Sequence, residues 1–464
     1  MLRQLSERVS PEEALRLLQK ADTAELMMRA DQVRRRMHDR NVYYVHSLNL
    51  NPTNVCENQC GLCAFWREDQ AQGAYTLTIP QLRERLERAR SWRLTDVHVV
   101  GGLNPQLDLN YYLDLFRTVR SVLPGTTLQA LTAVEIHWLS TRSGKAVADV
   151  LTALKAAGLD AVPGGGAEVF AGRVRERICP SKISAEQWLE VHRIAHSLDI
   201  PSNATVLFGH IETPEEIVDH LRRLRDLQDQ TGGFLAFCPL PFHTAGTKIG
   251  VTLGPGGHAV ARVVALARIF LDNFPHIRVL ANFLDRKLLQ ILLHGGADDV
   301  GGTSIDERIA RSAGAPDDFI FRSVDEMGTF VRGLGFHPVL TSSTYGSQTA
   351  PPVVPAVRSH DISWRDTLEK ARAGIRLSAA EAIELHDAAP FQELGRVAHE
   401  RRRQVVGTDR STFIIDRNIS FTNVCTVGCR FCAYHRPHGD DGAFSMSIPE
   451  IVQRVLEAVS LGAT

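Results

Sequence analysis

The residues most able to do chemistry in this sequence are six cysteines that form two triplets. Both triplets have the spacing Cys-x3-Cys-x2-Cys, at Cys56, Cys60 and Cys63 and again at Cys425, Cys429 and Cys432. Three thiolates can hold three irons of a [4Fe–4S] cluster and leave the fourth iron without a protein ligand. A structural zinc site needs four protein ligands and would have to borrow a distant one. An iron–sulfur site is therefore favoured over zinc or unligated thiols.

The two remaining cysteines, Cys179 and Cys238, are isolated in the sequence, and we predict ordinary buried thiols at both. A chain of 464 residues does not need disulfides to stabilise a core. Clustered thiols in such a chain indicate a reducing compartment. We therefore expect a cytoplasmic protein.

Both triplets lie within a long sequence repeat. NLNPTNVCENQCGLCAFWRED begins at Asn49 and NISFTNVCTVGCRFCAYHRPH begins at Asn418, an offset of 369 residues (418 minus 49). The last residue, Thr464, aligns with Thr95, which precedes the apolar run Asp96–Val100. We expect one complete module followed by the truncated start of a second. A small natural C-terminal domain is the alternative.

The first module alternates strand signals with helical patterns such as Ile79–Trp92 and Thr213–Asp229. Strands that alternate with helices predict a parallel α/β architecture. Eight strand signals over about 260 residues predict a (βα)8 TIM-type barrel. The predicted strands are Val45–Leu50, Val97–Val100, Leu128–Leu131, Ala161–Val162, Ala204–Phe208, Phe234–Phe237, Ile277–Leu280 and a run around Val300.

The predicted domain organisation has five parts. They are an N-terminal helical segment at 1–44, the barrel at 45–305, a C-terminal extension and linker at 306–362, a helical lead-in at 363–417 and the truncated second barrel at 418–464. The last part is expected to contain one strand, one cysteine loop and one helix. Thr341–Val357 is rich in Ser, Thr and Pro and is predicted to be a long loop.

A Cys-x3-Cys-x2-Cys loop after the first strand of a β/α barrel is typical of radical S-adenosylmethionine (SAM) enzymes. Two other segments resemble SAM-binding segments of that superfamily: VVGGLNP after the second strand and PGGGAE after the fourth. TVLFGHIE resembles its strand-five motif, although Thr205 stands where the motif has glycine. The resemblance implies that SAM is contacted by Gly101, Gly102, Glu168, Gly209 and Glu212.

Residues 10–340 resemble the aminofutalosine synthase family of the futalosine route to menaquinone. The segments that carry the resemblance are LNPTNVC, VVGGLNP, LTAVEI, AGLDAVPGGGAE, RICPSKIS, SNATVLFGHIET, CPLPFH and GADDVGGT. Residues 370–464 resemble the start of dehypoxanthine futalosine cyclase, an opening that enzymes of coenzyme F420 biosynthesis share.

The resemblance implies a transferase that holds a [4Fe–4S] cluster and uses SAM as a co-substrate. The expected reaction adds the 5′-deoxyadenosyl radical to the vinyl carbon of 3-[(1-carboxyvinyl)oxy]benzoate. Rearrangement and loss of the carboxyl carbon as CO2 or bicarbonate would give 6-amino-6-deoxyfutalosine. An electron donor such as flavodoxin or ferredoxin is the expected protein partner.

The two carboxylates of this substrate need positive or donor groups at the carboxyl ends of the strands. Candidates near predicted strand ends are His137, Asn203, His210 and His243, and for each histidine a structural role is the alternative. Arg177 and Lys182 could serve the same need, with solvated surface charge as the alternative.

Composition excludes two classes of partner. Lys plus Arg total 52 and Asp plus Glu total 53, which gives a net charge of −1 and no strong basic field for nucleic acid. No apolar run approaches the ~20 residues that span a bilayer. Two other functions stay open: a fragment of a two-module coenzyme F420 deazaflavin synthase, and a non-enzymatic iron–sulfur sensor.

Overall fold

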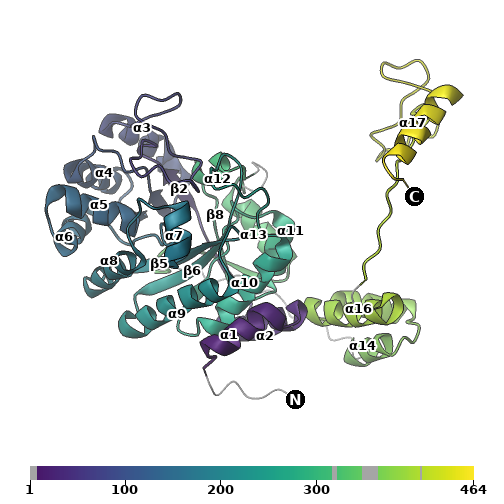
Figure 1. Cartoon of the computed structure of the whole chain (residues 1–464), viewed down its shortest axis with the longest axis horizontal. Helices are drawn as coiled ribbons and strands as arrows, with labels where there is room; N and C mark the ends of the chain where they lie inside the picture. Colours follow the sequence, from purple (N-terminus) through teal and green to yellow (C-terminus); the bar gives the residue numbers. More distant parts are fainter. Residues whose placement is uncertain (1–7, 316–320, 347–363, 408–409, 464) are drawn as a thin grey trace. The chain divides into compact units, whose positions relative to one another are not determined.

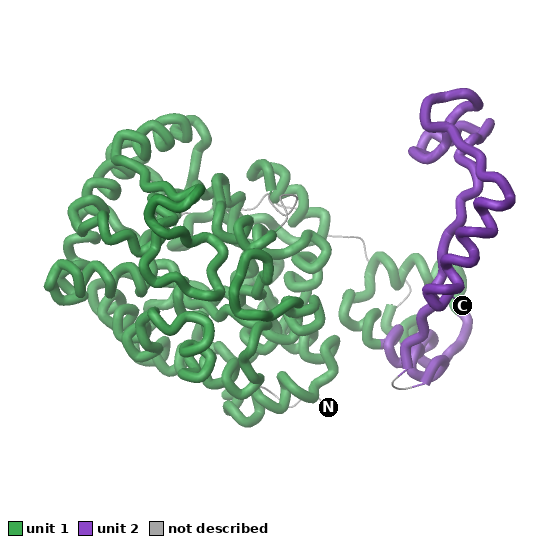
Figure 2. The backbone as a smooth tube through the Cα atoms, turned by 45° about the horizontal axis from the view of Figure 1, so that its top comes forward, with its two compact units in different colours: residues 1–368, 377–396 green, residues 369–376, 397–464 purple. Residues whose placement is uncertain are grey.

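The computed structural model describes residues 8–315, 321–346, 364–407 and 410–463. The chain divides into two compact units (Figure 2). Unit 1 comprises Met1–Leu368 and Leu377–Arg396, and unit 2 comprises Glu369–Arg376 and Val397–Thr464.

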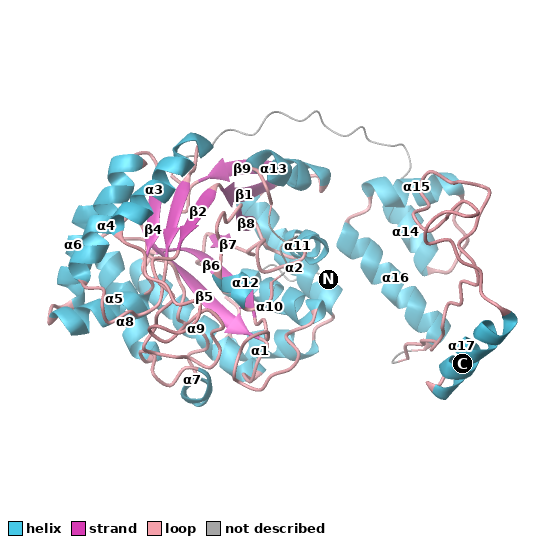
Figure 3. Cartoon of the chain, turned by 90° about the horizontal axis from the view of Figure 1, so that it is seen from above, coloured by secondary structure: helices cyan, strands magenta, loops and turns pink. Residues whose placement is uncertain are grey.

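Unit 1 is built around parallel strands that helices surround (Figures 1 and 3). The strands are β1 (Asn41–Val45), β2 (Ser47–Leu50), β3 (Asp96–Val99), β4 (Thr127–Ala130), β5 (Ser202–Phe208), β6 (Phe234–Pro241), β7 (His276–Ile277), β8 (Asp299–Gly302) and β9 (His337–Thr341). The expected first strand, Val45–Leu50, is thus two segments joined at His46, and it starts at Asn41 instead of after residue 44. Its first half therefore belongs to the sheet, not to the N-terminal helical segment.

Parallel pairing closes the strands into a ring. β2 pairs with β3 and β3 with β4, while β5 pairs with β6 and β6 with β7. Single bridges at Ala161 and Val162 join β4 to β5, so the predicted fourth strand is a minimal one. The Arg278–Asp299 bridge joins β7 to β8, and the Leu48–Ile305 bridge closes the ring onto β2. The predicted α/β barrel is confirmed, and a closed ring leaves no open edge among its eight positions.

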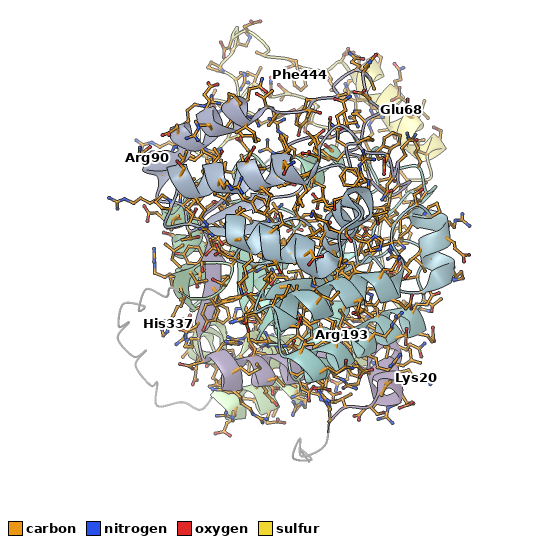
Figure 4. All side chains as sticks on the ribbon, turned by 90° about the vertical axis from the view of Figure 1, so that its left-hand side faces the viewer. Lys20, Glu68, Arg90, Arg193, His337 and Phe444 are labelled. Atoms are coloured by element: carbon orange, nitrogen blue, oxygen red, sulfur yellow. The ribbon has the colours of Figure 1, made fainter. Side chains whose placement is uncertain are left out.

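Helices follow most strands and cover the outside of the ring (Figure 3). They are α1 (Pro11–Lys20), α2 (Thr23–His38), α3 (Ile79–Ala89), η1 (Arg90–Trp92), α4 (Leu109–Val122), α5 (Ala133–Ser143), α6 (Val147–Ala157), α7 (Gly172–Ile178), α8 (Ala185–Ser197), α9 (Pro214–Thr231), α10 (Gly257–Phe270), α11 (Arg286–Leu293), α12 (Ile309–Ser312) and α13 (Val324–Gly333). The helical pattern predicted at Thr213–Asp229 forms α9, which Thr213 caps through a reciprocal hydrogen bond with Glu216. Charged side chains such as Arg90 and Arg193 project from the outer surface (Figure 4).

β9 is an extra strand within residues 306–362, where the sequence predicts a C-terminal extension and linker. It pairs in parallel with β1, from Asn41 opposite His337 to Val45 opposite Thr341. In the order β8-β1-β9 it lies at the edge. An edge position tolerates Pro338, which has no N–H to donate to a further strand.

The C-terminal region contains the expected lead-in helices and a second cysteine loop. The helices are α14 (Trp364–Arg372), α15 (Ala379–Ala388) and α16 (Phe391–Val406), and α17 (Ile448–Ser460) follows the loop. The prediction of a strand at the start of the second copy is wrong: no strand forms among the described residues 410–463. A strand is stabilised by ladder partners, and among those described residues only isolated bridges are available.

Candidate active site

A cavity of about 410 Å³ occupies the interior of the barrel. Residues from or directly after all eight ring positions line it, and all three cysteines of the first triplet are among them. Active sites of β/α barrels lie at the carboxyl ends of the strands, where the cysteine loop leaves β2. This cavity is therefore the candidate active site.

The loop that carries the first triplet is fixed by its own hydrogen bonds. Asn54 donates to the Gly73 carbonyl (2.9 Å) and accepts from the Tyr75 N–H (2.8 Å), which ties the two ends of the loop together. The Cys63 N–H donates to the Cys60 carbonyl (3.1 Å), so these two side chains leave one tight turn. Cys60 is buried, Cys56 and Cys63 are half-buried, and all three thiols are free.

The second cysteine loop repeats this architecture residue for residue. Asn423 donates to the Gly442 carbonyl (2.9 Å) and accepts from the Phe444 N–H (2.8 Å). Both backbone bridges recur at the offset of 369: Thr53–Thr76 and Val55–Arg67 become Thr422–Ser445 and Val424–Arg436. The loop conformation is thus encoded locally, without the barrel.

Two glycines after β3 hold the first cysteine loop against the barrel. A Cβ on Gly102 would lie 2.1 Å from the Val55 carbonyl oxygen, so only glycine fits there. The Gly101 N–H donates to Glu135 Oε1 (3.0 Å). Both glycines line the cavity, as expected for residues that approach SAM.

Glu135 was not among the predicted site residues, although it lines the cavity. Its Oε2 accepts hydrogen bonds from the N–H and hydroxyl of Thr132, which caps α5. Burial raises the pKa of Glu135 to about 7, against the lowering effect of the Thr132 and Gly101 hydrogen bonds. The Thr-x-x-Glu capping box in LTAVEI was the sequence signal for it.

Lys182 and Glu168 form a buried ion pair in the cavity wall. Burial alone would lower the pKa of Lys182, but Glu168 and the thiols of Cys60 and Cys179 raise it above its ordinary value. Lys182 is therefore a fixed cation beside the cysteines, and the alternative of solvated surface charge is wrong for it. Arg177, by contrast, is exposed.

The structure brings several predicted site residues to the cavity. Gly101, Gly102, Glu168, Asn203 and His243 all line it. His243 Nε2 lies 3.0 Å from the Phe283 carbonyl, and the Asn203 Oδ1 is buried without a hydrogen-bond partner among the described residues. Cys179 and Cys238 are buried, as predicted, and Cys238 also faces the cavity.

Four other predicted residues do not line the cavity. Glu212 turns back onto its own loop after β5, where it accepts hydrogen bonds from the N–H groups of Gly209 and His210. The His210 ring is held there too, with Nδ1 2.9 Å from Glu212 Oε2. His137 lies on α5, two residues beyond Glu135. Residues two apart do not share a helix face, so its side chain does not follow that of Glu135 into the cavity.

The cysteine loop fits a [4Fe–4S] cluster, because the three cysteines of one loop line a cavity that leaves room for a ligand at the fourth iron. The model of the radical SAM superfamily matches residues 50–224, and that of the CofH/MqnC C-terminal region matches residues 231–354. The chain belongs to the radical SAM superfamily. It is an enzyme that uses a [4Fe–4S] cluster and SAM.

Two groups of relatives are similar over most of the barrel. An aminodeoxyfutalosine synthase from Thermus thermophilus is 45% identical over 313 residues, which are 67% of this chain and 84% of the relative. A 5-amino-6-(D-ribitylamino)uracil–L-tyrosine 4-hydroxyphenyl transferase from Methanopyrus kandleri is 37% identical over 331 residues, 70% of this chain and 89% of the relative. The family is thus the one that contains aminodeoxyfutalosine synthase.

Solved structures confirm the fold. Methylornithine synthase aligns with a TM-score of 0.59 at 15% identity, over 72% of this chain and 95% of that chain. The [FeFe]-hydrogenase maturase HydG from Carboxydothermus hydrogenoformans also aligns at 0.59, with 17% identity over 86% and 87%. None of the described helices is long and apolar enough to cross a membrane.

Proposed function

We propose that this enzyme is an aminodeoxyfutalosine synthase. It adds the 5′-deoxyadenosyl radical to the vinyl carbon of 3-[(1-carboxyvinyl)oxy]benzoate, and rearrangement with loss of the carboxyl carbon yields 6-amino-6-deoxyfutalosine for menaquinone biosynthesis. The observation that carries the proposal is the 45% identity to the Thermus enzyme, against 37% to the Methanopyrus transferase.

In this proposal Cys56, Cys60 and Cys63 would hold the cluster, and the chemistry that the cluster would supply is the one-electron reduction that cleaves SAM. The backbone at Gly101 and Gly102 approaches SAM closely because neither residue carries a side chain, and Glu135 fixes Gly101 through its N–H. The Glu168–Lys182 pair places a fixed charge on the same wall. A fixed charge in a cavity shielded from water acts more strongly than one in solvent.

The residues outside the cavity act indirectly in this proposal. Gly209, His210 and Glu212 form one hydrogen-bonded turn after β5, which supports the strand that Asn203 and Thr205 share. A reductant of the flavodoxin or ferredoxin class would deliver the electron. Cys425, Cys429 and Cys432 lie on a loop with the same hydrogen bonds as the first, which supports a second cluster site there.

The runner-up function is that of the 4-hydroxyphenyl transferases, because several relatives at 33–37% identity bear that name. One assay separates the two. The full chain, reconstituted with iron and sulfide and reduced by dithionite, is given SAM with either 3-[(1-carboxyvinyl)oxy]benzoate or tyrosine plus 5-amino-6-(D-ribitylamino)uracil. Mass spectrometry should find aminodeoxyfutalosine in the first mixture and no coupled product in the second. The opposite result would assign the transferase activity.

A further inference from the structure

Polar side chains from several strands line the interior of this barrel, where β/α barrels are usually filled by branched apolar side chains. Alternation along the strands shows this clearly. On β2 and just after it, Ser47, Asn49 and Asn51 line the cavity, while Leu48 and Leu50 pack in the outer core. On the next strands the cavity is lined by Asp96, His98, Gln129, Asn203 and Thr205. Polar groups placed within a largely apolar cavity fix the orientation of a bound ligand and select its polar groups.

Arg278 is a buried cation that lines this interior. It is 4% exposed and bridges to Asp299, the first residue of β8, so it lies level with the amino end of that strand. The cysteine loop follows the carboxyl end of β2. Arg278 and the cysteines therefore lie at different depths of one cavity.

The guanidinium of Arg278 is held on two of its three nitrogens. Nε donates to Asp299 Oδ2 (2.9 Å), and Nη2 donates to the Tyr345 hydroxyl (2.9 Å). The same hydroxyl donates to Asp299 Oδ2 (2.5 Å), so Arg278, Tyr345 and Asp299 form a closed hydrogen-bond network. Among the described residues, none accepts a hydrogen bond from Nη1. A fixed guanidinium with one free nitrogen is preorganised for an oxyanion.

A second donor in the same interior also lacks a partner. Gln129 Nε2 is buried and has no hydrogen bond among the described residues, although a donor in that position costs free energy unless a ligand or water satisfies it. Asp96, on the neighbouring strand, does not meet this need: its carboxylate accepts from the Ser343 N–H (2.7 Å) and the Thr95 hydroxyl (2.6 Å), not from Gln129. His98 adds no charge, since burial lowers its pKa to about 4.

We infer that Arg278 Nη1 and Gln129 Nε2 form a carboxylate subsite in the depth of the barrel, which binds the aryl carboxylate of the substrate. The choice of an aryl carboxylate rests on the proposed function. The reacting vinyl group must lie near the cysteine loop. The aryl carboxylate, which the benzene ring separates from the vinyl group, then points into the barrel. Asp299 offsets the charge of Arg278. The subsite therefore selects a carboxylate over a neutral group by directed hydrogen bonds more than by net charge.

The test compares two ligands of the same shape, 3-hydroxybenzoate and 3-hydroxybenzamide, in equilibrium binding to the reconstituted, SAM-loaded full chain. The wild type should prefer the benzoate by roughly 10- to 100-fold, the range of a hydrogen bond to a charged group. Arg278→Gln should lose most of this preference. Arg278→Lys should keep part of it, because lysine retains the charge but not the planar fork. Iron content and SAM binding check that each variant is folded.

Lys182→Gln is the matched control, since Lys182 is the other permanently charged cation that lines the cavity. The benzoate preference should survive this change. A preference that is absent in the wild type, persists in Arg278→Gln or disappears in Lys182→Gln would overturn the subsite. If the Arg278-dependent preference is found but no aminodeoxyfutalosine forms, the subsite stands and the proposed function fails. If product forms and the preference ignores Arg278, the subsite alone fails.

Discussion

Gly102 lies directly against the cysteine loop: a Cβ on it would come within 2.1 Å of the Val55 carbonyl oxygen and 3.0 Å of the Cβ of Cys56. Backbone atoms cannot move aside as a flexible side chain can. The conformation of the loop and the absence of a side chain at Gly102 are therefore one structural requirement.

Gly102→Ala should consequently displace the first cysteine of the triplet. In a chain whose second triplet (Cys425, Cys429 and Cys432) is replaced by Ala, we expect Gly102→Ala to lower the bound iron to less than about a tenth and to remove the ~400 nm absorbance of thiolate-bound iron. Gly125→Ala is the matched control, because nothing lies within 4 Å of its Cβ position and its φ is not positive. Equal iron content in the two variants would contradict the role given to Gly102.

Glu135→Gln should weaken SAM binding without removing the cluster. All three groups that face the Glu135 carboxylate are donors, so an amide must turn its own N–H₂ toward one of them. The N–H of Gly101 then loses its fixed acceptor, and we expect the Kd for SAM to rise about 10-fold, the value of one charge-assisted hydrogen bond. Isothermal titration calorimetry on the reconstituted enzyme measures the Kd for SAM. Unchanged affinity would show that Gly101 is held without Glu135.

The two cysteine triplets should differ in their effect on product formation. Replacing any one of Cys56, Cys60 or Cys63 by Ala removes one of three ligands at the cavity, and no aminodeoxyfutalosine should form. Replacing Cys425, Cys429 and Cys432 together by Ala should leave the rate within about two-fold. Cys179→Ser serves as a control for a buried thiol outside the triplets. Activity lost with the second triplet would show that it takes part in the reaction.

The turn after β5 should make unit 1 sensitive to acid. Burial alone would raise the pKa of Glu212, but the His210 ring and the N–H groups of Gly209 and His210 lower it to about 2. A carboxyl with a depressed folded pKa contributes stability above its ordinary pKa of 4.5, and that contribution is lost as pH falls from 4.5 toward 2. Glu212→Gln should cost about 2 kcal/mol at pH 7 in urea unfolding. The difference from wild type should shrink below pH 4.5, and a constant difference would place the stabilisation elsewhere.

Sequence patterning predicted the barrel because buried parallel strands leave strong apolar runs between helices. It failed at β9, where Pro338 and a following polar segment resemble a loop and the pairing with β1 is set by tertiary contact. It also failed at the strand of the second copy. NISFTNV carries the same local signal as NLNPTNV, but a strand needs a neighbour that no local signal supplies.

The cysteines and Gly102 could be predicted as site residues because the loop that they form is local. Lys182 was a candidate whose burial was not predicted, and Arg278 was missed, since each is a single cation whose burial depends on tertiary contact with a partner, Glu168 or Tyr345. Nearness to a strand end was a poor guide for His137 and His210, because helix phase and turn geometry decide where such a side chain points.

The central claim, that the adenosyl group of SAM becomes part of the product, is tested most directly by following that group. The reconstituted full chain is reduced and given 3-[(1-carboxyvinyl)oxy]benzoate together with SAM that carries ¹³C throughout its adenosyl moiety. The label should appear in aminodeoxyfutalosine, formed in proportion to the SAM consumed. Label found only in 5′-deoxyadenosine, with the benzoate ether unchanged, would contradict the account.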